Sequence, residues 1–118
     1  MTIDEKAREL GRLIGQSPEY QGVKRANDAL NGDREAVTLL RQMEEVRMEA
    51  QQMIERGQNP TPEMEQQLDG LLSQVQVNAT YQRAISAQEN FDKVMLRVND
   101  QILDGIRKGA TSSIITLA

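Results

Sequence analysis

The stretch DREAVTLLRQMEEVRMEAQQMIERG, residues 33–57, decides the fold of this 118-residue chain. Its apolar residues follow one another at alternating steps of three and four: Ala36, Leu39, Met43, Val46, Ala50 and Met53. This spacing places them on one side of an α-helix and is typical of a helix that pairs with another helix. Asp33 is a good N-cap and Gly57 a good stop, so the sequence predicts a helix over residues 34–56 with an apolar seam.

A proline-rich loop follows this helix and makes the chain turn. Pro60 and Pro62 disfavour helix, and Thr61 is placed to cap the next one. The same rhythm then returns at Met64, Leu68, Leu71 and Val75, and again at Ala84, Gln88, Phe91, Met95, Val98 and Ile102. We therefore predict a long antiparallel helix hairpin. Asn78 either caps a new helix at Ala79 or lies inside one long helix, since no glycine or proline enforces a break there.

Two shorter helices precede the hairpin. The first, over about residues 2–16, would have one apolar side made of Ile3, Ala7, Leu10 and Ile14. Ser17 and Pro18 then mark the N-cap and first position of a second helix. Its inner face would carry Tyr20, Val23, Asn27 and Leu30, and Gly32 is expected to be its left-handed stop.

The helices together predict an all-α helical bundle with coiled-coil-like seams. Gly109 is expected to end the last helix, which gives one domain over residues 1–109 and a C-terminal tail over residues 110–118. At about 1.5 Å per residue, residues 34–56 span roughly 34 Å and residues 79–108 about 45 Å. The longer helix therefore keeps part of its stripe uncovered unless other helices lie against it. We expect a homodimer or higher homo-oligomer; the alternative is a monomer closed by its N-terminal helices.

Composition excludes several kinds of active site. The chain has no His and no Cys, which excludes disulfides, iron–sulfur clusters, thiolate or imidazole metal sites and a serine triad with a histidine base. The acidic residues lie off the apolar seams, as on solvated helix faces, and the scattered glycines form no phosphate-binding loop. The only kind of metal site that the composition does not exclude is one with oxygen ligands for Mg²⁺ or Ca²⁺. The sequence therefore predicts no enzyme: no catalytic residue, no metal and no cofactor.

Charge and hydropathy restrict the partners. Eighteen acidic and fourteen basic residues give a net charge of −4, and the few aromatic residues are expected on buried faces. Both features disfavour direct nucleic-acid binding, which uses basic grooves and exposed aromatic rings. No stretch is long and apolar enough to span a bilayer, and the first residues do not resemble a secretory signal. We expect a soluble cytoplasmic protein without membrane contact.

The remaining candidate site is an apolar helical surface. Met43, Met53, Met64 and Met95 lie on seams and are interpreted as core filling rather than as an adaptable groove, with Met48 as the surface exception. Gln88, polar on a seam, either sets the register of a partner helix or extends at the bundle edge. The apolar tail either packs on the bundle or is captured by another protein. The candidate interface comprises Leu10, Ile14, Tyr20, Met48, Gln88, Phe91, Met95, Val98, Asn99 and Ile102.

Short landmarks also run along the chain in a fixed order. They are Ile3, Ala7-Arg8-Glu9-Leu10-Gly11 and Ile14; Ser17-Pro18-Glu19-Tyr20; Asp33, Glu35 and Ala36; Thr61-Pro62-Glu63; Asn78; Ala87 and Glu89; and Val98-Asn99 with Ile102. Each one alone could be a helix cap or a core stripe. The ordered set, which covers residues 3–105, resembles the YlbF/YmcA family of small bacterial helical proteins.

The resemblance implies a cytoplasmic, all-α, non-enzymatic protein that tends to dimerise. In spore-forming relatives, members assemble with one another and a further partner to support ribonuclease Y-dependent RNA processing, and through it competence, sporulation and biofilm formation. Complexes in the family have been associated with iron–sulfur clusters, which a cysteine-free chain cannot ligate. We therefore expect a regulatory or scaffolding protein that binds proteins of the YlbF/YmcA type through helices. The alternative is a direct RNA-binding cofactor of a ribonuclease.

Overall fold

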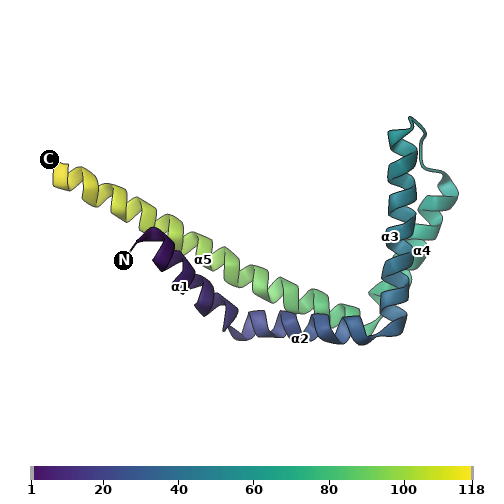
Figure 1. Ribbon diagram of the computed structural model, residues 1–118, viewed down its shortest axis with the longest axis horizontal. Helices are drawn as coiled ribbons and strands as arrows, with labels where there is room; N and C mark the ends of the chain where they lie inside the picture. Colours follow the sequence, from purple (N-terminus) through teal and green to yellow (C-terminus); the bar gives the residue numbers. More distant parts are fainter. Residues whose placement is uncertain (1, 118) are drawn as a thin grey trace.

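The computed structural model describes residues 2–117, with side chains described through residue 111. The helices are α1 (Ile3–Gly15), α2 (Pro18–Gly32), α3 (Arg34–Glu55), α4 (Pro62–Gln76) and α5 (Ala79–Leu117). Helices α3 and α4 pair as a hairpin, while α1 and α2 follow each other along α5 (Figure 1). We call the first unit the hairpin arm and the second the long arm. The expected all-α class is confirmed.

Each helix begins at a side chain that accepts a backbone hydrogen bond from the residue three positions later. The capping residues are Thr2, Ser17, Asp33, Thr61 and Asn78. Such caps satisfy amide groups that have no partner inside the helix. Asn78 Oδ1 accepts from the Tyr81 N–H at 2.9 Å, and α4 has ended at Gln76. Of the two alternatives, the first is therefore correct: Asn78 caps a new helix that begins at Ala79.

Gly57 ends α3 as predicted, Gly32 ends α2 without the predicted left-handed conformation, and Gly109 does not end α5. Gly57 has φ 78°, and Gln58 N–H donates to the carbonyl of Met53 at 2.8 Å, which closes α3 in a left-handed cap. Gly32 stays helical because Asp33 alone joins α2 to α3 and leaves no room for such a cap. Gly109 does not end α5, which continues to Leu117, because glycine lowers helix propensity without forbidding helix. The division into a domain and a tail stays a prediction.

The main core lies between α3 and α4. Its buried cluster, with half-buried neighbours such as Met64 and Leu68 against it, consists of Leu39, Met43, Val46, Leu71 and Val75. These residues belong to the two seams that the three-four spacing predicts. Full burial of a large apolar side chain contributes about 1.5–3 kcal/mol to the free energy of folding. This burial stabilises the hairpin arm.

A thinner core joins α2 to α5. Val23 and Ala84 are buried, and the rings of Tyr20 and Phe91 meet with centroids 5.3 Å apart at 60°. Asn27 is exposed, so its expected place on the inner face is wrong; Ala26 is half-buried instead. The small alanine can approach a neighbouring helix without desolvating an amide.

The two arms meet at a double junction. Asp33 lies between α2 and α3, Asn78 lies between α4 and α5, and Asn78 Nδ2 donates to Asp33 Oδ2 at 3.2 Å. The backbone N–H of Ala36, then the side chains of Thr80 and Asn78, lower the pKa of Asp33 by stabilising its charged form. A pair of capping residues therefore links both connections between the arms.

The molecule is long and open rather than closed. Its radius of gyration is 21.6 Å, against about 14 Å for a compact chain of this length. Its accessible surface is 9190 Å², against about 6,500 Å² for a compact monomer of 13.3 kDa. The arrangement thus exposes about 2,700 Å² more surface than a closed fold would.

Candidate protein interaction surface

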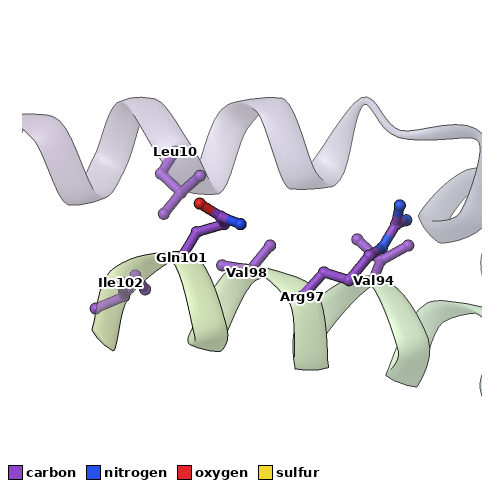
Figure 2. A pocket seen from close by; sticks show the side chains of 6 residues that line it. All are labelled: Leu10, Val94, Arg97, Val98, Gln101 and Ile102. Atoms are coloured by element: carbon purple, nitrogen blue, oxygen red, sulfur yellow. The ribbon is translucent and has the colours of Figure 1, made fainter. Parts of the chain in front are cut away.

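An apolar groove of about 540 Å³ lies on the long arm between α1 and α5. Figure 2 shows Leu10 descending from α1 toward Val98 and Gln101, which rise from α5. The half-buried Leu10, Val94 and Val98 make it apolar, and Arg97 and Gln101 are polar lining residues. Helix α1 does not pack closely enough on α5 to fill this space.

Helix α1 itself is only partly covered. Leu10 and Ile14 on its apolar side are half-buried, but Ile3 on the same side is 87% exposed. Leu13, on a neighbouring face, is 64% exposed. An amphipathic helix with this much uncovered apolar surface offers a face for another helix.

Helix α5 carries a further apolar face, which we call the outer stripe. It consists of Leu96, Asn99, Leu103, Ile106 and Ala110, all exposed, with Leu96 at 65% and Ile106 at 60%. Sequence analysis missed its apolar members, although their steps of three and four were readable. The seam through Val98 and Ile102 on the same helix shows the same three-four spacing, so the sequence alone did not separate the two stripes.

The structure brings together part of the predicted interface. Leu10, Val98 and Ile102 line the groove, and Tyr20 and Phe91 contact each other across α2 and α5. Ile14 and Met95 are half-buried, whereas Asn99 belongs to the outer stripe. That these residues form one interface stays a prediction.

Two predicted residues lie apart from the groove. Met48 is exposed on α3 in the hairpin arm, away from α1 (Figure 1). Gln88 is exposed, and its Nε2 donates to Asp92 Oδ1 at 2.9 Å on the same helix. The amide is therefore engaged at the edge of α5 rather than inside a packed seam.

Polar chemistry is sparse on this surface. Within the described part of the chain, no three acidic side chains gather to hold a metal ion. The ion pairs Lys6–Glu9 and Asp104–Lys108 join exposed residues one turn apart, so each contributes little to stability. No helix among the described residues is long and apolar enough to cross a membrane. What the long arm offers is apolar contact area.

These features define a class: small all-α proteins with an open helical arm that carries exposed apolar faces. Residues 3–107 match the family described as "Control of competence regulator ComK, YlbF/YmcA". The chain belongs to this YlbF/YmcA family, and the expected membership is confirmed.

Relatives of similar length span most of the chain. A UPF0342 protein of Streptococcus mutans serotype c is 32% identical over 91 residues, which are 75% of this chain and 80% of that protein. A UPF0342 protein of Leuconostoc mesenteroides is 24% identical over 100 residues, or 85% of this chain and 86% of the relative.

A solved structure shares the fold. A chain from the crystal structure of Bacillus subtilis RicA in complex with RicF superposes with a TM-score of 0.78 at 15% identity. The match covers 92% of this chain and 96% of that chain. At this identity the likeness supports the same arrangement of helices.

Proposed function

We propose that this protein is a non-enzymatic regulatory adaptor that binds other proteins through the apolar faces of its long arm. The observation that carries the proposal is the uncovered groove between α1 and α5, on a chain with about 2,700 Å² of surplus surface. An apolar patch that stays exposed in a monomer commonly marks an interaction site. Helix-in-groove contact is the mode of recognition that this surface fits.

The partners we propose are a second copy of the chain and other proteins of the YlbF/YmcA type. Membership of a family described by control of a competence regulator supports a regulatory role. The fold-matched chain comes from a structure in which RicA is in complex with RicF, which supports assembly through this fold. We place the protein in the cytoplasm and link it to RNA processing and developmental regulation, as the family resemblance implies.

Affinity capture tests the adaptor role. The tagged protein is purified from its own host, with and without ribonuclease treatment, beside an Ile102→Glu variant of the groove and an Ile54→Glu control. Both isoleucines are exposed, on α5 and α3 respectively, so neither change removes a core residue. We expect defined proteins to co-purify with the wild type and the control after ribonuclease treatment, but not with Ile102→Glu.

Two results would contradict the proposal. Equal recovery of the same proteins by Ile102→Glu would remove the groove from the interaction. Loss of all co-purifying proteins after ribonuclease treatment would favour the alternative, a direct RNA-binding cofactor of a ribonuclease. In that case, binding to purified RNA should weaken steeply as salt rises, because phosphate contacts release counterions.

A further inference from the structure

We propose that the outer stripe of α5 is the contact through which two copies of this chain pair, with their α5 helices antiparallel about a two-fold axis. The proposal rests on the self-association included in the proposed function and assigns it a surface and an orientation. The groove between α1 and α5 then remains available for a different protein.

The geometry of the stripe is that of a helix-pairing seam. Leu96, Asn99, Leu103, Ile106 and Ala110 follow one another at steps of three, four, three and four along about four helical turns. This alternation keeps a seam facing a partner helix over its whole length. The residues of α5 that line the groove toward α1 include Val94, Val98 and Gln101, which occupy another side of the helix. Apart from Leu96, which lines a pocket together with Glu19 of α2, the stripe therefore lies on a different side of α5 from the groove.

The self-complementary make-up of the outer stripe favours a second copy as the occupant. A specific protein complex typically buries about 800 Å² on each partner. In the outer stripe, the exposed apolar side chains that such a contact would bury are Leu96 at 65%, Leu103 at 49% and Ile106 at 60%. An isologous interface uses the same patch on both copies, so exposed leucine and isoleucine on one copy meet the same residues on the other.

Charge complementarity selects the antiparallel orientation. When Leu103 lies opposite Ile106 of the second copy, Asp100 and Arg107 flank the same edge of the seam. Their positions along the paired helices differ by about 3 Å, within reach of an arginine side chain. The two-fold axis makes this pairing occur twice, and opposite charges flanking a seam set its orientation.

Asn99 fits the same register. It lies opposite Ala110 of the second copy, beside a small residue toward the end of the seam. An amide in that place keeps contact with solvent, whereas a parallel dimer would bring two Asn99 side chains together within the seam. Because polar amides inside a seam lower the stability of a helix pair, the antiparallel register suits this sequence better.

Light scattering on the purified full chain tests the surface. We compare the wild type, Leu103→Glu/Ile106→Glu and the control Ile54→Glu, in which an exposed residue of the hairpin arm outside the candidate interface changes. We expect a dimer for the wild type and the control. The outer-stripe variant should have a dissociation constant at least about a hundredfold higher, because four apolar side chains lose their burial in each dimer. Circular dichroism confirms that all three are helical.

The outcomes separate this inference from the proposed function. A wild-type dimer that survives the outer-stripe substitutions overturns the inference and leaves self-association standing. If the wild type stays monomeric at every concentration tested, both this inference and the proposed self-association are wrong. The capture experiment then decides whether the protein binds other proteins.

Spin-label distances test the orientation. Because the chain has no cysteine, Lys93→Cys and Thr111→Cys each give one labelling position on α5. With the axis between residues 104 and 105, the axial separation between identical labels is about 20 Å at residue 111 and about 35 Å at residue 93. Equal distances at the two positions would show parallel pairing and overturn the antiparallel arrangement.

Discussion

Replacing Asn78 with alanine should destabilise the protein at the junction between its arms. The Asn78 side chain accepts from the Tyr81 N–H at 2.9 Å and donates to Asp33 Oδ2 at 3.2 Å. Loss of an N-cap costs about 1 kcal/mol, and loss of a second, partly exposed hydrogen bond adds up to about 1 kcal/mol. We expect the free energy of unfolding to fall by about 1–2 kcal/mol.

Urea denaturation followed by circular dichroism measures this change. All variants are compared at one protein concentration, because self-association raises apparent stability. Asn78→Ser is the matched control, since serine is an equally good N-cap but is too short to reproduce the longer amide's bond to Asp33. It should lose clearly less stability than Asn78→Ala. Equal losses, or an alanine variant within about 0.3 kcal/mol of the wild type, would refute the capping argument.

Three further predictions concern the junction, the backbone and the core. The pKa of Asp33 is lowered in the folded state, so its stabilising contribution is present above its ordinary value of 3.8 and is lost as pH falls through the lower folded value. Urea midpoints measured at falling pH should therefore decline less in Asp33→Asn than in the wild type. Gly57→Ala should lower the melting temperature because φ is 78° there, whereas Gly70→Ala, in helix and with no atom near the added Cβ, should stabilise by up to about 1 kcal/mol. Leu71→Ala should cost about 3 kcal/mol in urea denaturation, since Leu71 lies in the buried cluster of the hairpin arm; a loss below about 1 kcal/mol would show that this core is not well packed.

Much of the fold was predictable because helix signals are local. Asp33 and Thr61 cap the helices that follow them, and the seam from Ala36 to Val46 packs on the seam that ends at Val75. Capping involves residues three positions apart, and an apolar stripe involves neighbouring turns, so both are visible in a short stretch of sequence.

Predictions that depend on the surroundings were less reliable. Gly32 ends α2 without the expected left-handed conformation, and Gly109 does not end α5, because glycine permits a left-handed residue without requiring one. Asn27 matches the spacing of an inner face, yet Asn27 is exposed and Ala26 is the half-buried residue. A shift of one residue around a helix is decided by the neighbouring element.

For the candidate site, the sequence alone determined which stripes exist, including Leu10 on α1 and Val98 on α5. The tertiary structure decided which of them remain uncovered, leaving the groove and the outer stripe exposed. Helical periodicity is a property of a few consecutive turns, whereas burial depends on where distant helices lie. Here the two arms meet at a junction where a hydrogen bond joins Asp33 to Asn78, 45 residues apart in the chain.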